Sequence, residues 1–263
     1  MAERENSAFR LYRFIQRMVP QPDNMPTAQV LLNAFGIEKT SSAREQNAIF
    51  ARVSFLLFTE LELLVSELKR HDYSDEAINP ITAPFDRLSA GGWAATWNHN
   101  KGGFAASLIA LRPIAETPNL LTDDGVAVSK DELAALSKDI EALRQEVQIS
   151  DLPETVKEFI LRQLDIISDA MRDYPLAGVK AFKKAAETAI FHEAAHSEIV
   201  TQYSEKPQMT TLRAIQAKVV QVSKFSVEFA KFLAVIDTLY YHHSGTLLPA
   251  AHHLSGWVQH LLK

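Results

Sequence analysis

A pair of histidines one helical turn apart is the feature of this sequence with the most specific chemical meaning. His192, Glu193 and His196 form the pattern H-E-x-x-H. On a helix the two imidazoles lie on one side and can bind a single zinc ion, while the carboxylate of Glu193 can activate a metal-bound water as a general base. The pattern therefore raises the hypothesis of a zinc-dependent hydrolase, with His192 and His196 as metal ligands and Glu193 as the catalytic residue.

These five residues resemble the motif of the metallopeptidase zincins, and the resemblance does not extend beyond them. Glu198 stands two residues after the second histidine, where those families tend to carry an apolar residue, and no third histidine or Met-turn follows at metzincin spacing. The apolar stripe of the helix is centred near Glu193, so a buried structural role competes with catalysis. Candidate third ligands are Glu198 and Glu205, or Glu228 and Asp237 further along the chain.

The composition excludes several other classes of chemistry. The 263 residues include no cysteine, which rules out a disulfide framework, a thiol nucleophile and cysteine-ligated zinc. No phosphate-binding loop, dinucleotide fingerprint or nucleophile elbow occurs. With 27 basic and 32 acidic residues, the net charge of −5 provides no general attraction for a phosphate backbone, so we expect no nucleic-acid partner.

Helical spacing of apolar residues dominates the chain that must position the motif. Strand-like alternation is almost absent, and residues 41–70 and 210–241 each carry apolar residues at helical spacing. In the first of these segments Glu60 and Glu67 fall off the apolar stripe. The sequence predicts an all-α multi-helix bundle of about eight to eleven helices, organised around these two long core helices.

The segment from 79 to 119 differs from the rest because prolines and glycine pairs interrupt it. This punctuation predicts an insert of short helices, such as Phe104–Leu111, joined by glycine turns. Trp93, Trp97 and His99 lie in the same insert. A pocket for a small apolar ligand near these side chains is therefore a weaker functional alternative.

A polar, turn-rich connection at 120–129 predicts the boundary between two lobes. We expect an N-terminal helical lobe at 1–119 and a C-terminal helical lobe at 130–263, with one continuous domain as the alternative. Ser129 and Glu132 match a capping box that opens a helix. Limited proteolysis is expected to cut first in the connection, because polar turns are exposed.

Proline positions predict the boundaries of the helices around the histidines. Pro153 opens a helix that is expected to end before Tyr174. Pro175 then opens a helix that runs to about Tyr203 and contains the H-E-x-x-H pattern.

The C-terminal part of the chain suggests a surface for association. The 210–241 helix is apolar on more than one side, with Phe225, Phe229 and Phe232 beyond what one packed face needs. Thr238–Leu262 lacks charged residues, but glycine, proline and histidine interrupt it, so we expect no membrane span. The apolar surface of the 210–241 helix beyond one packed face predicts a protein partner or a homo-oligomer.

These observations favour an interaction protein over an enzyme. The N-terminal residues show no uninterrupted apolar run of the signal-peptide type, which predicts a cytoplasmic protein. We expect a helical protein–protein interaction protein, acting as an adaptor, regulator or scaffold, that self-associates and needs no cofactor. The zinc-dependent hydrolase, with zinc as its cofactor, is the alternative.

Overall fold

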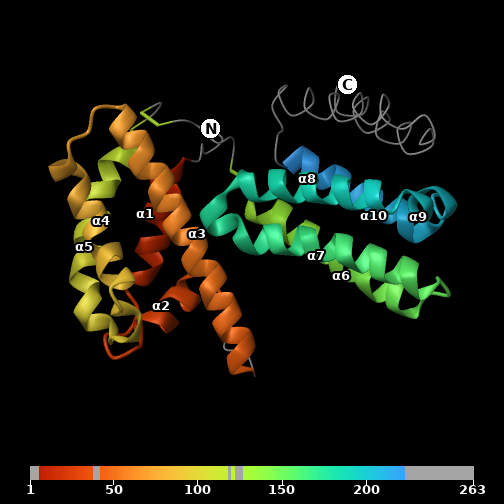
Figure 1. Cartoon of the computed structure of the whole chain (residues 1–263), viewed down its shortest axis with the longest axis horizontal. Coiled ribbons are helices and arrows are strands. Elements are labelled where there is room, and N and C mark those ends of the chain that lie inside the picture. The colour runs from red at the N-terminus through yellow and green to blue at the C-terminus, as the bar shows by residue number, and fades with distance from the viewer. Residues whose placement is uncertain (1–5, 38–41, 118–119, 122–126, 223–263) are drawn as a thin grey trace. The chain divides into compact units, whose positions relative to one another are not determined.

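The computed structural model describes residues 6–37, 42–117, 120–121 and 127–222. These residues form ten α-helices and one short 3-10 helix, and they contain no strand (Figure 1). The all-α prediction and its range of helix counts are confirmed. No helix in this described part of the chain has both the length and the apolar character needed to cross a membrane.

The chain divides into two compact units. Unit 1 consists of Met1–Gly125 and Pro175–Gly178, and unit 2 consists of Val126–Tyr174 and Val179–Lys263. The lobes at 1–119 and 130–263, with one continuous domain as the alternative, stay a prediction, which limited proteolysis tests.

Unit 1 is built around its first helix. Its elements are α1 (Ser7–Met18), α2 (Thr27–Ala34), α3 (Ala43–Arg70), α4 (Asp75–Ser89), η1 (Gly92–Ala94) and α5 (Trp97–Glu116). Helix α1 packs against α2, α3 and α5, and α4 packs against α3 and α5. Phe14, Phe85, Phe104 and Trp97 are among the fully buried side chains of this core. The long helix predicted at 41–70 is α3.

The insert of short helices predicted at 79–119 is wrong, because residues 75–89 and 97–116 form two long helices, α4 and α5. Pro84 has no amide hydrogen, so the Pro80 carbonyl lacks its helical donor. The Ser107 hydroxyl of α5 donates to that carbonyl at 2.9 Å and takes the place of the missing bond. A Cβ at Gly103 would lie 3.2 Å from Cγ of Pro84. Proline and glycine here allow two helices to pack closely instead of ending them.

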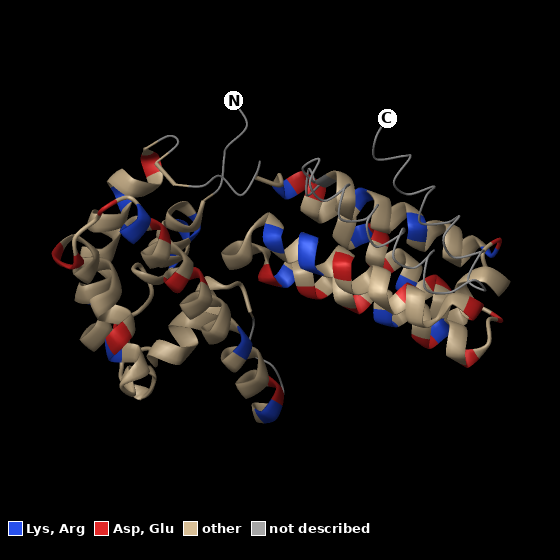
Figure 2. Ribbon diagram, turned by 45° about the horizontal axis from the view of Figure 1, so that its top comes forward, with Lys and Arg blue, Asp and Glu red and all other residues tan. Residues whose placement is uncertain are grey.

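The described part of unit 2 contains five helices. Its elements are α6 (Lys130–Ile149), α7 (Glu154–Ala177, whose last residues belong to unit 1), α8 (Val179–Ala195), α9 (Ser197–Gln202) and α10 (Pro207–Val222). Basic and acidic residues are interspersed along these helices (Figure 2). Ion pairs join neighbouring helices, Arg144 to Asp165 at 2.9 Å and Lys218 to Asp139 at 2.5 Å.

Two sequence predictions concern the ends of these helices. The capping box of Ser129 and Glu132 is present and opens α6. Helix α10 begins the second predicted long helix, and the remainder of the 210–241 segment, with its three phenylalanines, lies outside the described residues.

The helix start predicted at Pro153 is confirmed, since α7 begins at Glu154, but the boundary predicted at Pro175 is wrong. Helix α7 continues through Pro175 to Ala177. Gly178 then adopts a φ of +57°, and a Cβ there would lie 2.8 Å from Nη1 of Arg10, so this position requires glycine. A proline removes one hydrogen bond, which a helix tolerates, whereas a left-handed residue redirects the chain. The single helix predicted from Pro175 to Tyr203 is therefore divided between α7, α8 and α9.

Candidate functional site

The two histidines of the H-E-x-x-H pattern come together at the end of α8. Their ring centroids are 4.4 Å apart. The His192 ring stacks on Phe159 of α7, with centroids 5.2 Å apart and planes 9° from parallel. His196 lies just after α8, with φ −120° and ψ 33°, and its Nδ1 is 2.8 Å from the carbonyl oxygen of His192. The pattern thus spans a helix break, contrary to the continuous helix expected.

The hydrogen bonds of His192 place its proton away from Nδ1. Gln163 of α7 is completely buried, and its Nε2 donates to the Ala189 carbonyl at 3.2 Å and to Nδ1 of His192 at 3.1 Å. The amide orientation follows from these partners, since Gln163 Oε1 accepts from Gln216 Nε2 at 3.4 Å. A neutral imidazole that accepts at Nδ1 carries its proton on Nε2. Zinc binding through Nε2 would therefore require the Gln163 contact to change.

Burial and neighbouring charges favour the neutral form of His192. Burial lowers the pKa of His192 below its usual 6.5, and the neighbouring His196 and Arg162 lower it further. A neutral ring is what the donated hydrogen bond from Gln163 requires. A metal ligand also needs a neutral ring, so the charge of the ring alone does not distinguish a structural role from metal binding.

Glu193 is directed to an amide of another helix. Its Oε1 accepts a hydrogen bond from Gln216 Nε2 of α10 at 2.5 Å. Burial raises the pKa of Glu193, opposed by the hydrogen bond from Gln216 and by the charge of Arg213. Raised carboxyl pKa values occur both in active sites and in protein cores, so the pKa alone does not identify the role of Glu193. Its hydrogen-bond partner is the more informative observation. Here that partner is a structural glutamine.

The candidate third ligands do not complete a metal site in the described part of the chain. There, no three His, Asp or Glu side chains lie close enough to hold one ion. Glu198 and Glu205 are exposed, and Glu228 and Asp237 lie outside the described residues. Among the residues described, the pattern contributes to a polar network through His192, Gln163, Gln216 and Glu193. This network joins α7, α8 and α10.

The residues of the predicted apolar pocket lie in different surroundings. Trp97 is fully buried against Phe104, with ring centroids 5.5 Å apart. Trp93 packs edge-on against Phe50 at 5.1 Å, and His99 is exposed. The two tryptophans therefore serve the core of unit 1.

Sequence reasoning missed a buried ion pair in unit 1. Glu60 is only 3% exposed, and its Oε1 accepts from Nε of Arg10 at 3.0 Å. The same Arg10 Nε donates to the Leu176 carbonyl at 2.9 Å. Glu67, also expected off the core, is 9% exposed, and its Oε2 accepts from the Ser7 hydroxyl at 3.1 Å.

A signal for this burial was present in the spacing of α3. Glu60 stands three residues after Leu57 and four before Leu64, both of which are fully buried. Side chains three and four apart share a helix face. Complementary charge on α1, from Arg10 within its apolar face, was the second part of the signal.

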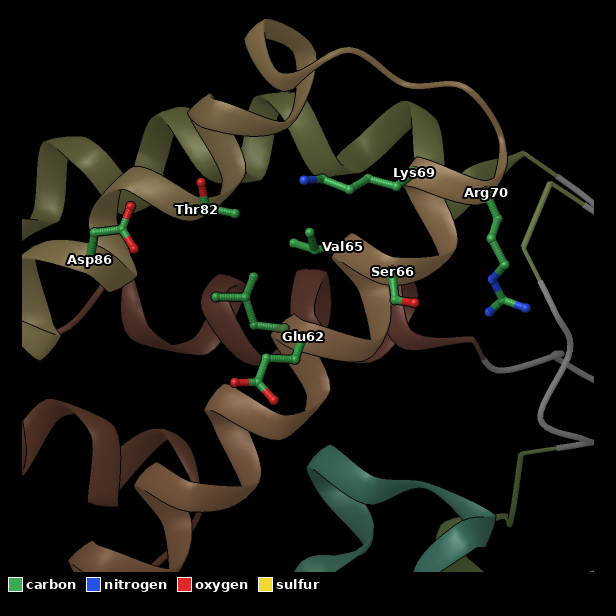
Figure 3. Close-up of a pocket in the computed structure, with 8 residues that line it drawn as sticks. Glu62, Val65, Ser66, Lys69, Arg70, Thr82 and Asp86 are labelled. Carbon is green, nitrogen blue, oxygen red and sulfur yellow. The ribbon is translucent and has the colours of Figure 1, made fainter.

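Sequence reasoning also missed a groove between α3 and α4, with a volume of about 600 Å³ (Figure 3). Its residues are Leu61, Glu62, Val65, Ser66, Lys69 and Arg70 from α3, with Thr82 and Asp86 from α4. Leu61 and Val65 supply apolar surface. The charged side chains surround that surface, so the groove combines an apolar part with a polar rim, as protein-binding surfaces do.

Comparison with known proteins adds no relative. No family model matches the chain, and no characterised protein or solved structure shows significant similarity to it.

Proposed function

We propose that this chain is a cytoplasmic helical protein–protein interaction protein of the adaptor or scaffold type, and that it self-associates. The groove between α3 and α4 is the observation that supports this proposal. It is open, lies along a 28-residue helix, and offers an apolar surface between charged side chains. An amphipathic helix is the kind of ligand that such a surface accommodates.

Exposed apolar residues on α3 support the same proposal. Phe55 is 69% exposed and Leu63 is 40% exposed. Single exposed apolar residues are common on protein surfaces, but these two lie on the helix that forms the groove. Covering them would add apolar area to an association along α3.

The mass of the full-length protein in solution tests this function. We expect light scattering to show the average mass rising from 29.4 kDa towards twice that value, over about 1 to 100 µM, the range in which modest interfaces associate. Salt should weaken the association where charged rims contribute. A mass that stays at one chain throughout the range would overturn the proposal.

A further inference from the structure

The charges of the α3–α4 groove are separated along its length. Glu62 and Asp86 lie towards one end, and Lys69 and Arg70 leave the backbone of α3 towards the other, with Val65 between them (Figure 3). The Lys69 side chain extends from there towards α4, where it pairs with Asp75. Glu62 and Lys69 are seven residues apart on α3, which is close to two turns and about 10 Å along one face. The groove therefore has one acidic end and one basic end.

The acidic end is open to a new partner. Glu62 and Asp86 are exposed and form no ion pair with any residue that the structure describes. At the basic end, Lys69 pairs with Asp75 at 3.3 Å and Arg70 pairs with Glu67 at 3.7 Å. The lysine pair is exposed on both sides, so Lys69 can exchange partners at little cost.

We infer that the occupant of this groove is a second copy of the chain, with α3 antiparallel to its counterpart about a twofold axis near Val65 and Ser66. Such an axis places residue 62 opposite residue 69 of the other copy, because the two numbers are equally distant from the axis. Each Glu62 then faces a Lys69, and the acidic end of each groove faces the basic end of the other. A surface that matches itself in this way is what a twofold dimer requires.

Apolar and charged residues contribute differently to this contact. Burial of the apolar surface around Leu61 and Val65 supplies affinity. The charges select the orientation, because a parallel arrangement would bring the two acidic ends together. A partner segment of another protein would need no such internal symmetry in the groove.

Charge reversal in the full-length protein tests the arrangement. We expect Glu62→Lys and Lys69→Glu each to raise the dimer dissociation constant about tenfold or more, since each creates two like-charge contacts. The double variant Glu62→Lys/Lys69→Glu restores opposite charges across the axis and should return the dissociation constant to near the original value. Sedimentation velocity measures the constants, and circular dichroism checks that each variant is folded.

Matched controls come from the exposed ion pair of α5, Arg112 and Glu116. Glu116→Lys and Arg112→Glu change the net charge by the same amounts and should leave the dissociation constant unchanged. Loss of the dimer in both single variants without recovery in the double variant would overturn the inference.

This inference rests on the proposed function, and the two can fail separately. If no concentration produces a dimer, the proposed function fails. If a dimer forms and all three groove variants leave it unchanged, self-association stands and its surface lies elsewhere, so only this inference fails.

Discussion

The buried network around Arg10 in unit 1 and the buried network around Gln163 in unit 2 are built from different groups. Unit 1 encloses full charges, with Arg10 against Glu60 and the Leu176 carbonyl. Unit 2 encloses amides, with Gln163 and Gln216 linking a neutral histidine to the carboxyl of Glu193. A buried charge needs its opposite charge, whereas a buried amide needs only hydrogen-bond partners. Loss of one partner should therefore be more damaging in unit 1 than in unit 2.

The largest effect is expected for Glu60→Leu. The substitution leaves the Arg10 guanidinium buried without its carboxylate, which should lower the free energy of unfolding by about 3 to 5 kcal/mol. Urea denaturation followed by circular dichroism measures the loss. The double variant Arg10→Met/Glu60→Leu removes both charges and should recover much of it. An equal or greater loss in the double variant would show that the charges are not what couples these positions.

A smaller effect is expected for Gln163→Leu. It leaves the Ala189 carbonyl and His192 without the amide donor, at a cost of about 1 to 3 kcal/mol. Gln148→Leu, at an exposed position of α6, is the matched control and should change stability little. If Gln163→Leu proved as costly as Glu60→Leu, the contrast between charged and neutral burial would be wrong.

Glu193→Gln should alter how stability depends on pH. Because the folded-state pKa of Glu193 is raised above 4.5, the folded protein binds the proton more tightly, and stability falls as pH rises through the folded pKa. Glutamine does not titrate, and its oxygen can still accept from Gln216. The variant should be more stable than the parent at pH 8, with a difference that shrinks towards pH 4.5. Thermal melts at several pH values measure it, and a difference independent of pH would contradict the burial of this carboxyl.

The smallest effect is expected at the proposed zinc ligands. If the polar network is structural, the protein purifies without stoichiometric zinc, and His196→Ala changes stability only modestly, because His196 is exposed. Elemental analysis measures the metal. About one zinc per chain, with a hydrolytic activity that Glu193→Gln abolishes while zinc is retained, would establish the hydrolase alternative.

Local patterns predicted the helical class and several helix starts. The apolar spacing of 41–70 corresponds to α3, and Ser129 with Glu132 caps α6 as expected. These features depend on residues within one or two turns of each other, so a sequence read locally contains them. The H-E-x-x-H spacing likewise predicted that His192 and His196 would be neighbours.

The errors arose where a distant residue changes the meaning of a local signal. The prolines of α4 did not end the helix, because Ser107 of α5 supplies a donor to the Pro80 carbonyl. The break after α7 came instead at Gly178, where Arg10 occupies the space that a side chain would need. Neither partner can be identified from the few residues around the signal.

The sequence by itself determined where apolar residues recur and hence which segments form helices. Tertiary structure decided which polar residues are buried and with what partners, since Glu60 meets Arg10 and Glu193 meets Gln216 only after helices far apart in the chain pack together. It also decided that α3 and α4 leave a groove between them. The reason is physical: helix formation depends on bonds four residues apart, whereas burial and binding surfaces depend on which helix faces approach each other.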